Sequence, residues 1–156
     1  KTLEFLGDSF KPFSLGGNFS LLQSEVHLSD QDLQNKRAFF PGLSDTRPLY
    51  DQSPYILNVD FNFEKPDWGT SASLILNVSG PRITLTKLNT EDVYEQPAPT
   101  LDFVYAQKLG ANTSFKFSAK NLLNPAFERT YGKNSSLIYS SYKKGTTFGL
   151  SFTYDF

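Results

Sequence analysis

The fold of this chain is decided by its last stretch, Lys144-Gly-Thr-Thr-Phe-Gly-Leu-Ser-Phe-Thr-Tyr-Asp-Phe156. From Phe148 onward, large apolar side chains alternate with small polar ones. Because successive side chains of a β-strand point to opposite faces, this stretch predicts a strand with one apolar and one polar face. A soluble protein would pack the apolar face on a core. A barrel in an outer membrane would turn it toward lipid.

The same alternation recurs along the chain and predicts about seven strands, without a convincing helix between them. The expected strands are 1–6, 13–22, 55–63, 71–79, 101–109, 114–120 and 148–156. Residues 82–88 either extend the fourth strand or begin the next loop. The charged residues within strands all fall on the polar set: Asp60, Asp102, Lys108, Lys116, Lys120 and Asp155.

The connections between these strands alternate between short and long. The short ones are 7–12, 64–69 and 110–112, and the long ones are 28–53, 89–99 and 124–143. Long irregular stretches are uncommon inside a compact soluble domain. Outer-membrane barrels have short periplasmic turns and long outer loops, so the alternation favours antiparallel up-and-down strands of a transmembrane β-barrel.

Composition limits the chemistry available to this chain of 156 residues. The net charge of −1 gives no reason to expect a nucleic-acid partner. Without cysteine there is no disulfide or thiolate site, and the single histidine, His27, cannot form a His-rich metal site. No apolar run is long enough for a membrane helix. Because methionine is also absent, we expect Lys1 to begin a mature or truncated piece of a longer protein.

Five short segments, in unbroken order, resemble the end of the barrel of a TonB-dependent outer-membrane receptor. They are Arg47-Pro-Leu-Tyr-Asp-Gln-Ser-Pro-Tyr-Ile-Leu-Asn58, Asn77-Val-Ser-Gly-Pro-Arg-Ile83, Asp92-Val-Tyr-Glu-Gln-Pro97, Lys120-Asn-Leu-Leu-Asn-Pro125 and Ser141-Tyr-Lys-Lys-Gly-Thr-Thr-Phe148. The resemblance implies that residues 1–156 form the C-terminal segment of a barrel of about 22 strands. It also implies a plug domain and a TonB-binding segment, which this chain lacks.

The function implied by the resemblance is active transport, without enzymatic chemistry or a cofactor. Such a receptor binds a scarce solute (a siderophore, cobalamin, glycan or peptide) and imports it across the outer membrane of a Gram-negative bacterium into the periplasm. Its expected partners are outer-membrane lipid, the remaining barrel strands and plug, the barrel-assembly machinery, and the inner-membrane TonB complex through the absent segments. The alternatives are a passive porin or another barrel independent of TonB, and a soluble β-sandwich binding module.

Two groups of residues are candidates for a role in this function. Aromatic and arginine side chains in long loops are suited to bind ligands, and an aromatic girdle at the membrane interface is the alternative. These ligand candidates are Arg47, Tyr50, Tyr94, Arg129, Tyr131, Tyr139 and Tyr142. The apolar row of the last strand resembles a signal for barrel assembly, and a purely lipid-facing row is the alternative. That row is Phe148, Leu150, Phe152, Tyr154 and Phe156.

No catalytic or metal site is predicted. Glu25, Asp30 and Asp32 lack the spacing and glycine of an EF-hand loop. A second acidic group, Glu91, Asp92 and Glu95, is expected to be a solvated part of an outer loop.

Overall fold

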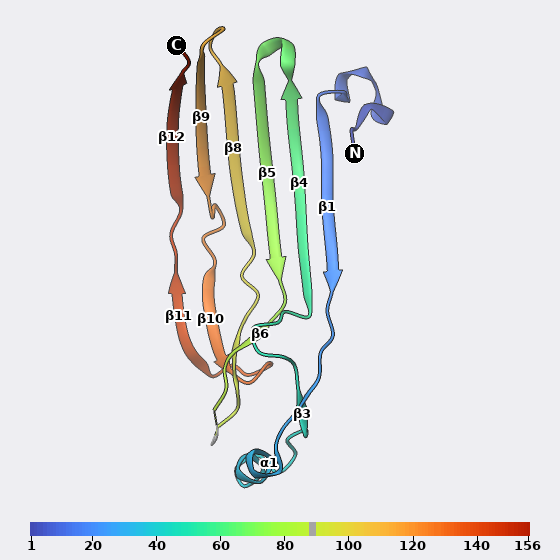
Figure 1. Ribbon diagram of the computed structural model, residues 1–156, viewed down its shortest axis with the longest axis vertical. Coiled ribbons are helices and arrows are strands. Elements are labelled where there is room, and N and C mark those ends of the chain that lie inside the picture. The colour runs from blue at the N-terminus through green and yellow to red at the C-terminus, as the bar shows by residue number, and fades with distance from the viewer. Residues whose placement is uncertain (88–89) are drawn as a thin grey trace.

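The computed structural model describes residues 1–87 and 90–156, and antiparallel sheets are its main elements (Figure 1). Residues 88 and 89, where we expected a strand extension and the start of a loop, lie outside the described residues. The largest sheet has the order β1-β4-β5-β8-β9-β12. Its strands are β1 (Phe13–Leu21), β4 (Tyr55–Lys65), β5 (Thr70–Ser79), β8 (Thr100–Lys108), β9 (Thr113–Lys120) and β12 (Thr147–Tyr154).

Two smaller sheets lie beyond one end of the large sheet. One has the order β11-β10-β7-β6, and the other pairs β2 with β3. Their strands are β2 (Val26–His27), β3 (Thr46–Arg47), β6 (Arg82–Leu85), β7 (Val93–Glu95), β10 (Ala126–Tyr131) and β11 (Ile138–Lys143). The prediction of an all-β, antiparallel chain is confirmed, and none of the three sheets closes into a barrel within the described residues.

The strand register places most of the large apolar residues on one face of the six-stranded sheet. One row of paired residues crosses every strand: Leu15, Phe61, Leu74, Phe103, Ala119 and Phe148. The neighbouring row on the opposite face includes Gly16, Asp60, Ile75 and Asp102. The alternation read from the sequence therefore corresponds to two distinct faces.

The six-stranded sheet is a single layer whose apolar face remains largely open (Figure 1). In β12 the side chains of Phe148 and Phe152 are 66% and 67% exposed. Most fully buried side chains lie elsewhere, around β6, β7 and β10 and the segments packed on them. They are Lys36, Ser53, Ile83, Val93, Phe127 and Thr130, and only Ala119 is buried in the large sheet.

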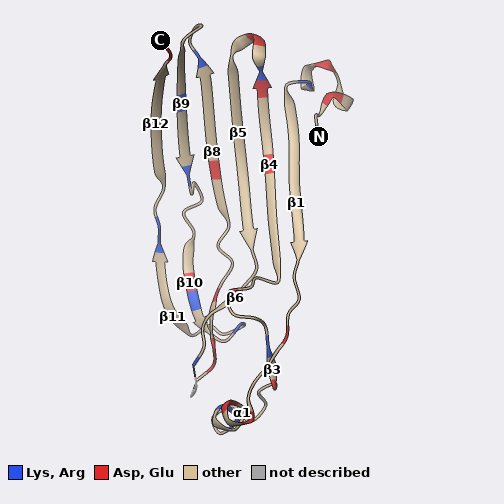
Figure 2. Ribbon diagram, in the orientation of Figure 1, with Lys and Arg blue, Asp and Glu red and all other residues tan. Residues whose placement is uncertain are grey.

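Short and long connections lie at opposite ends of the sheet, as the sequence pattern predicted. At one end, η3 (Pro66–Trp68) joins β4 to β5, residues 109–112 join β8 to β9, and the C-terminus lies nearby (Figure 1). The opposite end, here called the loop end, contains the two smaller sheets and helix α1 (Asp30–Arg37). Charged residues are sparse along the middle of the long strands (Figure 2).

The prediction of a strand over residues 1–6 is wrong. Residues 4–10 form two short 3-10 helices, η1 (Glu4–Leu6) and η2 (Asp8–Phe10), and Thr2 makes a single bridge to β1, at Ser14. Extended pairing stops where η1 begins at Glu4, and Gly7 separates the two helices with a φ of 124°, a conformation that side-chain-bearing residues rarely adopt. The large sheet therefore has six strands rather than seven.

The expectation that the loops would be irregular is also wrong. Ser29 caps α1 by accepting a hydrogen bond from Asp32 N at 3.2 Å. Acidic residues in the first turn of α1 and basic residues in the last favour the helix dipole. Because α1 lacks an apolar stripe, periodicity alone could not reveal it. Similarly, the expected loop 124–143 contains β10 and β11. No helix among the described residues has the length and apolarity to cross a membrane.

Candidate functional site

A row of alternating charges connects three strands of the loop end. Register places Glu95 of β7 between Arg82 of β6 and Arg129 of β10. The Glu95 carboxylate lies 2.8 Å from Arg82 Nη2 and 3.3 Å from Arg129 Nη2. Arg82 also contacts Asp51, with Nη1 and Oδ1 3.3 Å apart. The side chain of Glu95 is only 15% exposed, so our interpretation of this residue as solvated is wrong.

A second ionic group holds helix α1 and strand β3 against the β6–β7 region. The Lys36 ammonium lies 2.6 Å from Asp92 Oδ1, and Arg47 Nη1 lies 3.2 Å from Asp92 Oδ2. Lys36 and Asp92 have only 4% and 9% of their side chains exposed. The backbone N–H of Lys87 also donates to Asp92. Asp92 is therefore a buried cross-link, and our interpretation of it as part of a solvated loop is wrong.

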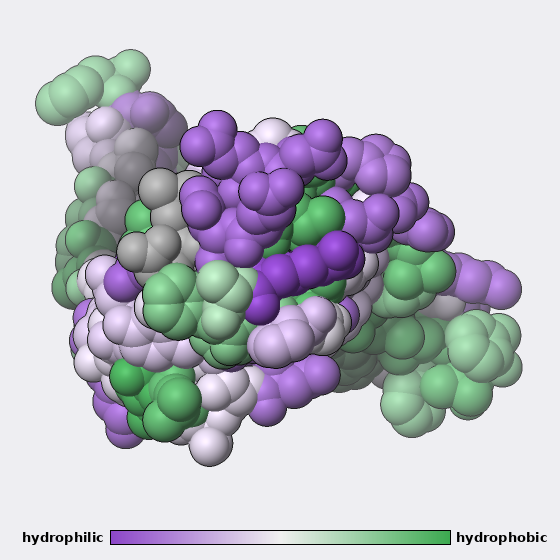
Figure 3. All heavy atoms as spheres, turned by 90° about the horizontal axis from the view of Figure 1, so that it is seen from below, coloured by the Kyte–Doolittle hydropathy of each residue, from purple (hydrophilic) through white to green (hydrophobic). Residues whose placement is uncertain are grey.

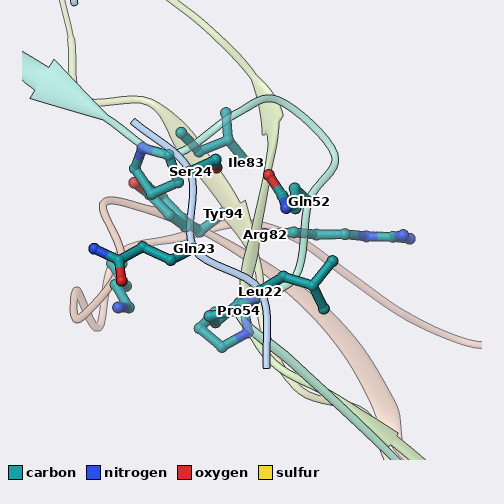
Figure 4. Close-up of a pocket in the computed structure, with 11 residues that line it drawn as sticks. Leu22, Gln23, Ser24, Gln52, Pro54, Arg82, Ile83 and Tyr94 are labelled. Atoms are coloured by element: carbon teal, nitrogen blue, oxygen red, sulfur yellow. The ribbon is translucent and has the colours of Figure 1, made fainter. Parts of the chain in front are cut away.

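The first of two adjacent pockets at the loop end is mostly apolar and has a volume of about 140 Å³. Its apolar wall is formed by Leu22, Pro48, Pro54, Pro81, Ile83 and Tyr94. The segment Leu22–Ser24 crosses in front of Ile83 and Tyr94, and the Arg82 side chain extends away from the group (Figure 4). The polar side of the pocket includes Gln52, whose Oε1 is buried and has no hydrogen-bond partner among the described residues.

The second pocket is more polar and has a volume of about 160 Å³. Its charged lining consists of Lys36, Arg47, Lys133, Glu91 and Asp92. Ser44 and Thr46 add two hydroxyls, whose oxygens are 3.3 Å apart. The two pockets share Pro48, Tyr94 and Lys133, so they lie side by side.

Tyr94 lines both pockets. Burial raises the pKa of its phenol above the ordinary value of 10.0, and the negative charge of Asp92 raises it further, whereas Arg47 acts in the opposite direction. The phenol therefore stays neutral at physiological pH and can serve as a hydrogen-bond donor.

The other tyrosine candidates lie in separate contacts. Tyr131 and Tyr139 pack edge to face with ring centroids 5.4 Å apart, and the Lys87 ammonium lies 5.2 and 4.7 Å from these rings. Tyr142 stacks on Phe127 at 5.6 Å. Tyr50 donates from its hydroxyl to Thr84 O at 2.6 Å.

All seven ligand candidates therefore lie at the loop end, outside the six-stranded sheet, but they do not form one site. The pockets bring together Arg47 and Tyr94, whereas Arg129 belongs to the Glu95 row. Sequence reasoning missed Lys36, Lys87 and Lys133. Lys36 sits in a polar run without apolar periodicity, and Lys133 lies in a stretch we interpreted as an irregular loop. Hydrophilic side chains cover the centre of the loop end, and hydrophobic ones lie toward its margins (Figure 3).

The other acidic candidates do not converge. Asp30 and Asp32 occupy the first turn of α1. No group of three or more His, Asp or Glu side chains suited to a metal ion occurs in residues 1–87 or 90–156.

The terminal strand β12 lies at an edge of the large sheet, where it pairs only with β9. The four alternate apolar side chains of β12 and that of Phe156 just beyond it are all at least 60% exposed: Phe148, Leu150, Phe152, Tyr154 and Phe156. Strand β1 forms the opposite edge. Residues 1–3 bond to the first residues of β1, and the rest of β1 and the whole of β12 offer backbone groups that could pair with further strands.

No family model, curated protein or solved structure matches this chain.

Proposed function

We propose that this chain is the C-terminal part of the barrel of a TonB-dependent active transporter in the outer membrane of a Gram-negative bacterium. The transporter would bind a scarce solute at its outer surface and import it into the periplasm. The observation that carries the proposal is a single-layer, two-faced sheet with an apolar row across all six strands and all its long connections at one end. Lipid is a natural environment for such a face.

The two free edges support the assignment to a larger barrel. A soluble protein protects its sheet edges, whereas barrel closure removes them by pairing the last strand with another. Here β12 presents an unpaired edge, and so does β1 beyond Leu15, where its bonding to residues 1–3 ends. Further strands and a plug domain in the same receptor would complete the barrel and fill its lumen, and the barrel-assembly machinery would recognise β12.

Residue polarity supports an orientation in which the second face lines the interior. Asp60, Asp102 and Lys116 lie on this face, and Gly16 leaves room for Asp60, because a Cβ on Gly16 would come within 2.8 Å of Asp60 Cγ. Charges facing lipid at the midplane would be costly, but charges facing a polar lumen are not. The loop end would then face the outside, and the short turns the periplasm.

Spin-label accessibility in the full-length protein, reconstituted in lipid vesicles, tests the orientation of the sheet. Phe117 and Lys116 are neighbours on β9 with opposite orientations, so each serves as the control for the other. A nitroxide at Phe117 should collide with dissolved oxygen, and one at Lys116 with a water-soluble nickel chelate. Equal accessibility to both relaxants at the two positions would contradict the membrane assignment, as would a compact monomer of the full-length protein in water without detergent.

Binding to TonB separates an active transporter from a passive porin. The full-length protein should co-purify with the periplasmic domain of TonB, and the reading frame upstream of Lys1 should encode a plug domain. A barrel that reconstitutes in lipid but lacks both properties would be a porin-like protein.

A further inference from the structure

We propose that the two adjacent pockets at the loop end form one binding site for a small amphipathic organic anion. The apolar part of the ligand would lie against the prolines and Tyr94 of the first pocket. Its carboxylate or phosphate would lie near Arg47 and Lys133 in the second. The binding of such an anion follows from the pockets alone. The further step, that the anion is the transported solute, rests on the proposed function.

Size and shape fit a ligand with two parts. A cavity of about 150 Å³ accommodates a benzene-sized group. Each of the two pockets is of this order, at about 140 and 160 Å³. Because Pro48, Tyr94 and Lys133 line both, one ligand could occupy both pockets across the Tyr94 ring.

The charge balance of the second pocket favours an anion. Its lining contains three cations, Lys36, Arg47 and Lys133, and two carboxylates, Glu91 and Asp92. Asp92 is shared by Lys36 and Arg47, so one carboxylate faces two cations. The Arg47 side chain is 27% exposed, so this residue is only partly covered by its neighbours.

Lys133 provides the second accessible cation. Its side chain forms no salt bridge within the described part of the chain, and its backbone is held in place because Gln96 Nε2 donates to Lys133 O at 3.1 Å. Glu91 opposes an anion, so the three cations and two carboxylates leave a net charge of one positive in this lining, and the Glu91 carboxylate lies beside Gly132. A Cβ at Gly132 would approach Glu91 Oε2 to 2.6 Å.

The first pocket offers no cation of its own beyond the shared Lys133. Arg82 is in its lining, but its guanidinium is engaged by Glu95 and Asp51 and extends away from the pocket (Figure 4). Three prolines and the Tyr94 ring give this part a rigid, apolar wall that suits a flat or cyclic group. The buried Oε1 of Gln52 could accept a hydrogen bond from a hydroxyl or amide of the ligand.

Benzoate and benzamide test the proposal because they have the same shape and differ in charge. Saturation-transfer NMR titrations on the full-length protein in detergent should show tighter binding of benzoate. Lys133→Gln should reduce benzoate affinity about two- to fivefold, as expected for a partly exposed ion pair, and leave benzamide unchanged. Lys143→Gln removes the same charge from the exposed face of β11, outside both pockets, and should change neither affinity.

The apolar half has its own variant. Tyr94→Leu should lower the affinities for benzoate and benzamide alike, because it removes the aromatic ring that lines both pockets. The proposal is overturned if benzoate shows no saturable binding, if its preference over benzamide is undiminished in Lys133→Gln, or if Lys143→Gln reduces that preference equally. Should Tyr94→Leu not fold, the two lysine variants still decide. If benzoate binds as expected while the spin labels exclude a lipid-facing sheet, the transporter assignment fails and the binding site stands.

Discussion

The Lys36 ammonium and the Asp92 carboxylate lie 2.6 Å apart, although 56 residues separate them in the chain. Their side chains are 4% and 9% exposed, so the buried Lys36 ammonium depends on Asp92 to compensate its charge. This contact joins the only α-helix of the described chain to the segment that precedes β7. It therefore determines where an otherwise polar loop sits on the loop end.

Removing the charge of Asp92 should release helix α1. Asp92→Asn leaves Lys36 buried without a carboxylate, and breaking a buried pair in this way costs about 3–5 kcal/mol. Hydrogen exchange of the full-length protein should show lost amide protection across α1. Asp45→Asn, at an exposed position in the same loop, should leave the protection of α1 unchanged. Equal exchange in the two variants would contradict a structural role for the pair.

A lysine on the apolar face should destabilise the full-length barrel far more than one on the polar face. Leu74 pairs with Phe61 and Phe103, whereas its neighbour Ser73 pairs with Asn62 and Val104 on the other face. Leu74→Lys should lower the free energy of unfolding by about 2–4 kcal/mol if residue 74 lies near the midplane of the bilayer. Ser73→Lys should lower it much less. Guanidinium unfolding in vesicles measures both costs. Similar values would refute the assignment of the two faces.

The terminal residue offers a test of the assembly signal. Phe156 is fully exposed, so a completed barrel should tolerate its loss. If the residue is read during assembly, deleting it should lower the amount of full-length protein in the outer membrane, while the purified variant still refolds in detergent. Unchanged outer-membrane levels would show that Phe156 is only another lipid-facing side chain.

The loop end should lose stability at alkaline pH through Tyr94. Its pKa is raised above 10.0 by burial and by Asp92, so the unfolded state ionises first as pH rises. Its contribution to stability is complete below pH 10 and is lost as pH rises through the folded pKa. The ultraviolet difference titration between the wild-type protein and Tyr94→Phe isolates this phenol. A midpoint at or below 10 would contradict the proposed cause.

The sequence predicted the six long strands because strand periodicity is a local property. Alternation from Phe148 to Phe156 requires one apolar face regardless of what covers it. The positions of the short and long connections could also be predicted from the sequence. Residues 1–6 were misassigned because so short a segment, followed by Gly7, cannot be distinguished by pattern from a strand.

The candidate site was only partly predictable. Arg47 and Tyr94 stood out by residue type and loop position, and the structure places both at the second pocket. Lys133 lies in a segment that we expected to be an irregular loop and that carries no motif. Asp92 lies in an acidic run, which is typical of a solvated loop. Their roles depend on contacts between segments far apart in sequence, which a local pattern does not record.

The sequence by itself determined which side chains share a face, because the two-residue period of a strand is set by backbone geometry. It also placed the charges of the expected strands on the polar face, and in the structure Lys65, the last residue of β4, is a charge on the apolar face. Only the tertiary structure decided that Lys36 and Asp92 meet and that Glu95 lies between Arg82 and Arg129. Burial of a charge is set by the segments that pack around it, and those segments come together only when the loops fold on one another.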